Sequence, residues 1–282
     1  MIPILTLIAL QALVFTSVGI AVRMQYSLFR GFDFIIAAVI VVSGEVFLTA
    51  AHQGTTFSVA LGTIFAVAIG VGITVTWNLG VDHVFGGVAA LGSILFVSSL
   101  GASTAISGIV GAVRGPGLRQ LPASTPAVYR QLADSSLYGL SVTSLALVAL
   151  FVWTTRPSGL AAALWTQSEE FAREIGITRR SLAVPAGIVS GGLAAIVGSY
   201  YAFSNGSTPE GGVTVFLYGT ATALLLPSGT LCATAISGVV LGGLYVLIQL
   251  LVSPALANLV LFALAMTILL VRGSSRSAEN VR

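Results

Sequence analysis

The feature that most constrains this fold is a series of long apolar runs that carry almost no charge. Charged residues make up only 7% of the 282 residues, and the mean hydropathy is +1.01. Soluble domains carry about 25% charged residues. A helix needs about 20 apolar residues to cross the hydrocarbon core of a membrane. The composition therefore predicts an all-α integral membrane protein, a polytopic bundle of transmembrane helices.

Nine candidate runs can be read along the chain. They cover residues 3–22, 34–51, 56–77, 85–104, 136–154, 181–203, 213–227, 231–251 and 254–272. The seventh run is short, rich in Gly and Thr, and ends at Leu226-Pro227-Ser228-Gly229. It therefore either crosses the membrane or forms a re-entrant half-helix, which is tolerated where protein covers its backbone. We expect eight or nine transmembrane helices in one domain, residues 1–272, followed by a short cytoplasmic tail, residues 273–282.

The distribution of Arg residues predicts the topology. If the loop 155–180 is cytoplasmic, nine crossings put the N-terminus outside and the C-terminus in the cytoplasm. Nine Arg residues then lie inside: Arg23, Arg30, Arg156, Arg173, Arg179, Arg180, Arg272, Arg276 and Arg282. Three lie outside, Arg114, Arg119 and Arg130, in a long loop with a short surface helix expected near residues 126–133. Nine Arg residues on the cytoplasmic side against three on the outer side agree with the usual excess of positive charge in cytoplasmic loops.

Several classes of function lack their sequence signals. The net charge of +3 comes from scattered Arg residues without a basic stripe, so we expect no nucleic-acid partner. The chain has no phosphate-binding loop, no His-Glu-x-x-His or Cys-x-x-Cys motif and no Gly-x-Ser-x-Gly elbow. Its single Cys232 lies in an apolar run, and His52 and His83 lie at opposite ends of the third run. We expect no catalytic site, metal site or bound cofactor in this chain.

A short charged segment, residues 155–180, separates two apolar runs. Thr166 and Glu169 have the spacing of a capping box, in which the Thr side chain accepts from a backbone N–H three residues on. Gly176 is a typical left-handed helix stop. The pattern predicts a short helix with Phe171 and Ile175 on one side and charged residues on another. Such a helix could lie on the membrane surface, insert its aromatic residue into a partner's groove, or simply be solvated.

This segment resembles a known family. The matching residues are Gly159-Leu160, Ala163-Leu164, Glu169 or Glu170, Ala172-Arg173 and Gly176-Ile177. They are similar to the cytoplasmic coupling loop of ABC importer permeases of the branched-chain amino-acid and ribose type. Residues 184–199 and 228–243 also resemble that family, so that the resemblance covers about residues 155–272. Upstream, residues 27–34 resemble the tryptophan/tyrosine permease subgroup, and Gly44-Glu45-Val46-Phe47 is similar to the Gly-Glu-Val-Tyr of branched-chain amino-acid permeases.

The resemblance implies a multi-pass permease in a bacterial plasma (inner) membrane, in contact with membrane lipid. Its implied partners are two ABC ATPase subunits that bind ATP and Mg²⁺, a second permease copy or a similar permease, and an extracytoplasmic solute-binding protein. The solute would be small and polar, an amino acid or a related compound. The residues implied to contact the ATPase are Glu169, Glu170, Phe171, Arg173, Glu174 and Gly176.

Three polar residues are candidates for the translocation pathway. Glu45 is an acid well inside a span, where burying its charge costs at least about 2.5 kcal/mol. It therefore either lines a pathway or forms an interhelical hydrogen bond to Ser or Thr. Gln11, a polar but uncharged residue inside a span, has the same two alternatives. Tyr200 belongs either to an aromatic belt or to a gate. Two other classes stay open: a self-contained secondary transporter or channel, and an integral-membrane enzyme or assembly scaffold.

Overall fold

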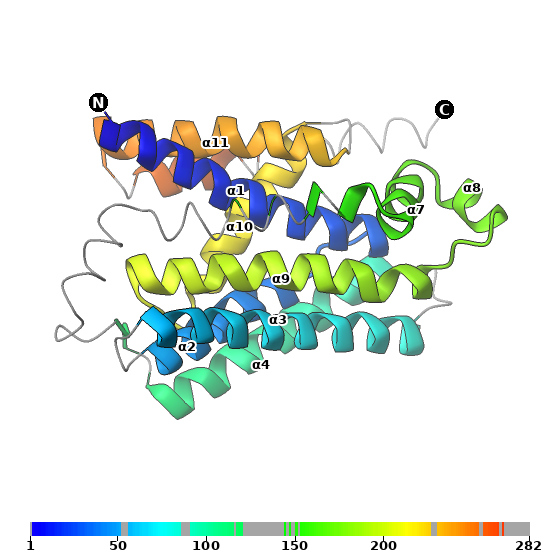
Figure 1. Cartoon of the computed structure of the whole chain (residues 1–282), viewed down its shortest axis with the longest axis horizontal. Helices are drawn as coiled ribbons and strands as arrows, with labels where there is room; N and C mark the ends of the chain where they lie inside the picture. Colours follow the sequence, from blue (N-terminus) through cyan, green and yellow to red (C-terminus); the bar gives the residue numbers. More distant parts are fainter. Residues whose placement is uncertain are drawn as a thin grey trace.

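The computed structural model describes residues 2–51, 56–85, 91–115, 117–120, 144, 147, 150–151, 153–226, 230–253, 256–264 and 267. The part of the chain that it describes is helical and contains no named strand (Figure 1). The helices are α1 (Ile2–Phe29), α2 (Ile35–Ala51), α3 (Thr56–Phe85), α4 (Leu91–Arg114), α7 (Pro157–Gln167), α8 (Glu169–Glu174), α9 (Arg179–Asn205), α10 (Gly211–Leu225) and α11 (Leu231–Leu251).

Five of these helices are long and apolar enough to cross a membrane: α1, α3, α4, α9 and α11. The helices α2 and α10 are apolar but shorter. The chain is thus an all-α, multi-pass membrane protein. Seven of the nine predicted runs correspond to these helices. The run 136–154 lies largely outside the described residues, and the run 254–272 is described, as helix, only at residues 256–264 and 267. The total of eight or nine spans stays a prediction, as does the surface helix near residues 126–133, which also lies outside them.

The predicted ends of three spans were wrong. The helix α1 continues seven residues beyond the predicted end at residue 22, α3 continues through His83 to Phe85, and α4 begins at Leu91 rather than at residue 85. A polar residue at position 25 does not end α1, because a neighbouring helix accepts its hydrogen bond. Gln25 is buried there and donates a hydrogen bond from Nε2 to the Ser190 hydroxyl of α9 at 2.7 Å.

Close contacts between small residues hold the bundle together. The helix α9 packs against α2 and α3, and α1 packs against α9, α10 and α11 (Figure 1). A Cβ placed on Gly191 of α9 would lie 2.7 Å from the Gly70 carbonyl oxygen of α3, so the two backbones touch. Such approaches stabilise helix pairs where both neighbours and lipid are apolar. The helices α3 and α4 expose large apolar side chains, among them Phe57 and Val113, as lipid-facing helices do.

The described Arg residues, except Arg23, separate into two groups at opposite ends of α9. Arg179 begins this helix, and Arg30 and Arg173 share an acid with it. Arg119 forms an isolated antiparallel bridge with Ser207, just beyond the other end. A helix of 27 residues separates the two groups by about 40 Å. We refer below to the α8 end and the opposite end of the bundle.

Candidate functional site

The charged segment folds as two helices with a sharp junction. Pro157 occupies the first turn of α7, and this helix runs on through Thr166 to Gln167. Thr166 is therefore inside a helix, so the predicted capping box with Glu169 was wrong. The N-cap of α8 is Ser168, whose extended backbone lets its hydroxyl accept a hydrogen bond from the Phe171 N–H at 3.2 Å.

The predicted stop at Gly176 is confirmed. Its φ of +85° lies in the left-handed region that glycine adopts without strain. The Gly176 N–H donates to the Arg173 carbonyl at 3.0 Å and the Ile177 N–H to the Ala172 carbonyl at 2.8 Å, the paired bonds of a Schellman motif. Two residues later Thr178 caps α9 in a reciprocal pair with Ser181. With both ends capped and only four residues between α8 and α9, α8 is tied closely to the start of α9.

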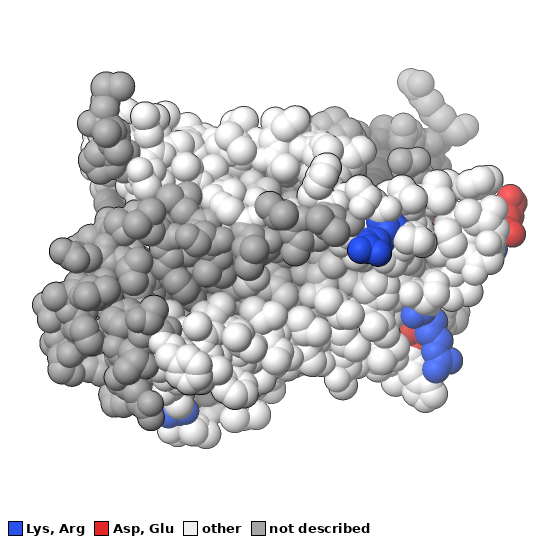
Figure 2. Space-filling model, viewed as in Figure 1, with Lys and Arg blue, Asp and Glu red and all other residues white. Residues whose placement is uncertain are grey.

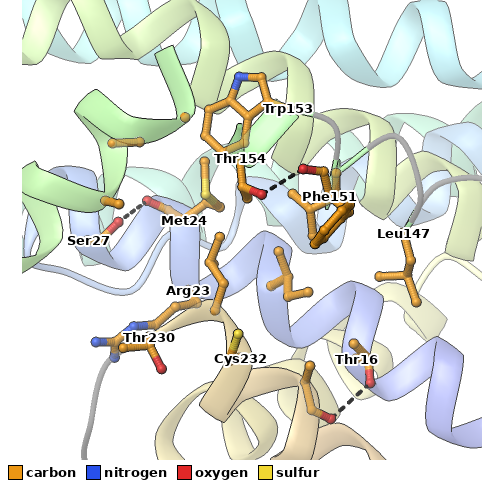
Figure 3. Close-up of a pocket in the computed structure, with 17 residues that line it drawn as sticks. Thr16, Arg23, Met24, Ser27, Leu147, Phe151, Trp153, Thr154, Thr230 and Cys232 are labelled. Carbon is orange, nitrogen blue, oxygen red and sulfur yellow. Dashed lines mark hydrogen bonds between the residues drawn. The ribbon is translucent and has the colours of Figure 1, made fainter. Parts of the chain in front are cut away.

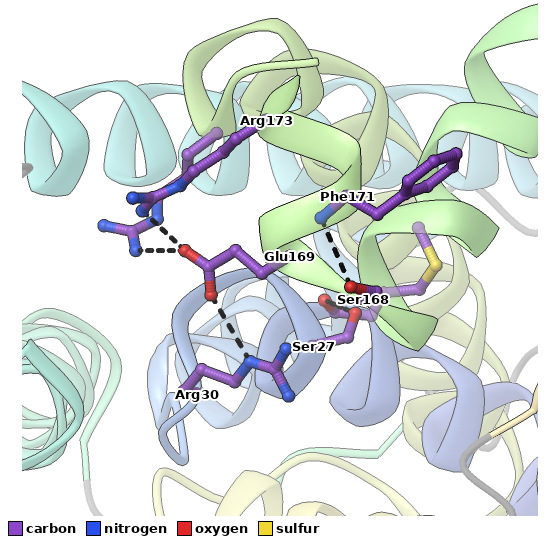
Figure 4. Close-up of polar contacts among 8 residues, drawn as sticks. Ser27, Arg30, Ser168, Glu169, Phe171 and Arg173 are labelled. Carbon is purple, nitrogen blue, oxygen red and sulfur yellow. Dashed lines mark hydrogen bonds and ion pairs between the residues drawn. The ribbon is translucent and has the colours of Figure 1, made fainter. Parts of the chain in front are cut away.

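Glu169 connects α8 to the ends of two spanning helices. Its Oε1 lies 2.6 Å from Arg173 of its own helix and 3.6 Å from Arg179 at the start of α9, and its Oε2 lies 3.7 Å from Arg30 just after α1. Figure 4 shows the carboxylate pointing between Arg30 and Arg173. Isolated exposed ion pairs contribute little, but several charges in one network fix geometry better than a single pair. Glu169 is therefore the point at which three elements meet.

The outer face of α8 combines apolar and acidic side chains. Phe171 and Ile175 are 51% and 52% exposed, whereas Ala172 on the inner side is buried. Glu170 and Glu174 are exposed beside them. Charged side chains are sparse on the face of the molecule in Figure 2 and gather toward the α8 end. This face, which we call the α8 face, can offer an aromatic anchor bordered by carboxylates to a partner.

Glu45 lies near the opposite end of the bundle and has a partner that the sequence did not reveal. It is 7% exposed, and its Oε2 lies 3.2 Å from an Arg119 guanidinium nitrogen, which also donates to the Thr49 hydroxyl. Its carboxylate thus pairs with Arg119 rather than with the Ser or Thr considered from the sequence. Glu45 also lines a cavity of about 500 Å³ between α2, α3 and α4, together with Arg114.

The other two pathway candidates lie on other helices, α1 and α9. Gln11 is half-buried in α1, where its backbone touches α11 beside Gly242. Tyr200 is buried in the main apolar cluster near the end of α9. The structure therefore brings Glu169 and Arg173 of the coupling set together, whereas Gln11, Glu45 and Tyr200 lie on three different helices, α1, α2 and α9.

Sequence reasoning missed a buried acid between α1 and α2. Asp33 is 2% exposed, and it accepts hydrogen bonds from the Ile35 N–H and from the Trp77 indole, each at 3.0 Å. The neighbouring Phe34 N–H donates to the Ser99 hydroxyl, which adds a contact to α4. An acid two residues before an apolar run is the signal that could have identified it as a cap for α2.

Comparison with known proteins adds no identification. No family model, curated protein or solved structure matches the chain. Among the described residues there is also no group of three His, Cys, Asp or Glu side chains that could hold a metal ion.

Proposed function

We propose that this chain is the transmembrane permease subunit of an ATP-driven ABC importer, and that the α8 face docks onto a cytoplasmic ATPase subunit. The observation that carries the proposal is the Glu169 network. A docking element transmits movement only if it is rigid and joined to the parts that must move. The helix α8 is capped at both ends, and Glu169 joins it to α1 and α9.

The chemistry of the α8 face indicates what kind of partner surface fits. Phe171 and Ile175 would enter an apolar cleft, and Glu170 and Glu174 would meet basic groups around it. Aromatic side chains that fill such a cleft often dominate the affinity of an interface. The same proposal places the α8 end in the cytoplasm of a bacterial inner membrane. Two permease copies, or this chain and a similar one, would form the pathway for a small polar solute that a binding protein delivers.

The proposal is tested by copurification with ABC-type ATPase subunits of the same genome and by measurement of ATP hydrolysis. Phe171→Ala removes the anchor, and we expect association to weaken about 30-fold or more. Glu170→Arg reverses one charge of the border and should weaken association further. Phe57→Ala and Glu210→Arg are matched controls, because these exposed residues lie at the opposite end of the bundle. The docking proposal fails if both α8 variants associate and support hydrolysis as well as the wild type does.

A second candidate function is a secondary transporter driven by an ion gradient. The observation that favours it is Asp33, a buried carboxyl within the helix bundle, because acids at such positions often serve proton relays. Both Asp33 oxygens already accept hydrogen bonds, from Ile35 and Trp77, which suits a structural role equally well. Liposomes that contain the chain alone decide between a transport role and a structural role of Asp33. Uptake of a small polar solute that is driven by a pH gradient and lost in Asp33→Asn would support the transporter.

A further inference from the structure

The cavity of about 500 Å³ beside Glu45, which we call the Glu45 cavity, lies near the opposite end of the bundle. Its floor is α2, which packs against both α3 and α4. Its walls are mostly apolar and include Val42 and Val46 of α2, Phe65 and Ile69 of α3, and Ile109 and Val113 of α4. The side chains named from α3 and α4 are exposed. The cavity therefore opens between α3 and α4, toward the surface that faces lipid.

Two groups of opposite charge line this cavity, Glu45 and Arg114. The Thr49 hydroxyl connects them, because it accepts hydrogen bonds from Arg114 at 3.1 Å and from Arg119 at 3.3 Å. The same Arg119 nitrogen lies 3.2 Å from Glu45 Oε2. One acid and two cations therefore form a single cluster at the cavity.

Both lining groups can still bind a ligand. The Thr49 hydroxyl donates its one proton to the Glu45 backbone carbonyl at 2.7 Å, so it cannot donate to the Glu45 carboxylate. Within the described part of the chain, Glu45 Oε1 accepts no hydrogen bond, and Arg114 contacts only the neutral Thr49 hydroxyl. A guanidinium carries five N–H donors. The cavity thus offers a carboxylate acceptor beside cationic donors.

The charged cluster lies toward the end of the bundle, and the apolar wall runs inward from it. Arg114 is the last residue of α4, and Thr49 is two residues before the end of α2. Glu45 lies about one turn further in, and Arg119 reaches its carboxylate from the bundle end, where the Arg119 backbone pairs with Ser207. From Thr49 inward to Val42 is seven residues, about 10 Å along a helix. This order of charge and apolar wall is that of a lipid headgroup and the first part of its acyl chain.

A groove beside α1, shown in Figure 3, provides a contrast. Its volume is about 440 Å³, and of the described residues that line it only Arg23 carries a charge. A single cation would not separate one phosphate-bearing lipid from another by its headgroup. The acid and the cations of the Glu45 cavity can do so, because they match a headgroup that carries both signs of charge.

We propose that the Glu45 cavity binds phosphatidylethanolamine, with the ammonium group at Glu45, the phosphate at Arg114 and the first part of an acyl chain along α2. A primary ammonium offers three N–H donors to a carboxylate. The quaternary ammonium of phosphatidylcholine has no N–H, and the headgroup of phosphatidylglycerol has no cation. The inference is independent of the importer proposal, since it concerns neither the α8 face nor an ATPase.

Alkylation of an introduced cysteine measures whether the cavity is occupied. Cys232→Ser removes the single native cysteine, and Ile109→Cys places a thiol on the α4 wall. The purified full chain is freed of lipid in an uncharged detergent, and its rate of reaction with a maleimide is measured. Dioleoyl phosphatidylethanolamine, phosphatidylcholine or phosphatidylglycerol is then added, so that only the headgroup differs. We expect phosphatidylethanolamine to slow alkylation at about a fivefold lower concentration than the other two lipids do.

Three further variants or ligands make the test specific. Gly108→Cys in the same background is the matched control, because Gly108 precedes Ile109 on α4, has open space around it and does not line the cavity. Glu45→Gln should abolish the preference for phosphatidylethanolamine. Arg114→Gln should weaken the protection by all three lipids, since each carries a phosphate. Leucine, which has an ammonium and a carboxylate but no long chain, tests whether the cavity takes a solute instead.

The proposal is overturned if phosphatidylethanolamine is not the most protective of the three lipids, or if the Gly108→Cys thiol shows the same preference. It is also overturned if Glu45→Gln keeps the preference or if Arg114→Gln leaves the protection unchanged. Should Glu45→Gln fail to fold, the result for Arg114→Gln decides. Stronger protection by leucine than by phosphatidylethanolamine would assign the cavity to a solute. If the Ile109→Cys thiol does not react without lipid, the chain itself closes the cavity and the proposal fails.

Discussion

The contact between α1 and α11 allows a sharp test of the packing, with two neighbouring glycines as a matched pair. A Cβ placed on Gly242 would lie 2.6 Å from both the N and the Cα of Ala12 and 2.8 Å from the carbonyl carbon of Gln11. All three atoms belong to the α1 backbone, so no side chain can turn away. A Cβ on Gly243 would meet only the Ile8 side chain at 3.8 Å, an ordinary contact.

The two Ala variants should therefore differ in stability by a predictable amount. Both gain helix propensity, up to about 1 kcal/mol relative to Gly. Only Gly242→Ala must in addition push α1 away from α11, and overpacking of this kind costs about 1–3 kcal/mol. We expect Gly243→Ala to unfold like the wild type or slightly later. Relative to it, Gly242→Ala should be destabilised by about 1–3 kcal/mol, which is about 5- to 150-fold in the unfolding equilibrium.

Unfolding by sodium dodecyl sulfate in mixed micelles, followed by tryptophan fluorescence, measures this difference. The buried Trp165 reports loss of tertiary packing. The comparison of two variants of one helix cancels effects of detergent and expression. If Gly242→Ala is as stable as Gly243→Ala, the two backbones are not in contact and the arrangement of α1 on α11 is wrong.

Three further predictions concern the polar contacts. Trp77→Phe leaves a buried Asp33 oxygen without its donor and should destabilise the fold by about 1–3 kcal/mol in the same unfolding assay. Glu169→Gln should leave the free energy of unfolding within about 1 kcal/mol of the wild type, because solvent-accessible ion pairs contribute little. It should nevertheless raise the rate of hydrogen exchange of the α8 amides. Unchanged exchange would show that the ion pairs of Glu169 do not hold α8 in place. Gly176→Ala forces a side chain into the left-handed region at a cost of about 1–2 kcal/mol, so the Ile177 amide should lose protection from hydrogen exchange. The control is Gly72→Ala, whose added methyl group meets open space and should leave exchange of the Ile177 amide unchanged.

The local features of the charged segment were largely predictable. Gly176 as a stop, the short helix before it and the exposed pair Phe171 and Ile175 follow from residues within two helical turns of one another. The cap was misplaced by two residues because Thr166 and Ser168 are both good N-caps. Which of the two residues caps α8 depends on where α7 ends, and the end of α7 is set by how far that helix can pack against the bundle.

The sequence by itself determined the class of the protein. Long apolar runs must become helices in a membrane because only helices satisfy their own backbone there without a closed barrel. It also located seven of the described helices and the segment with the candidate docking face. These outcomes depend on composition and on neighbours close in the chain.

The tertiary structure alone decided which charges meet. Glu169 with Arg30 and Arg179, Glu45 with Arg119, and Asp33 with Trp77 join residues from different segments of the chain, and some are more than seventy positions apart. The same is true of Gln25, which remains inside a longer α1 because Ser190 of α9 accepts its hydrogen bond. A single sequence carries no signal for such pairs, since they depend on helix rotation and depth, which the packing of small residues sets.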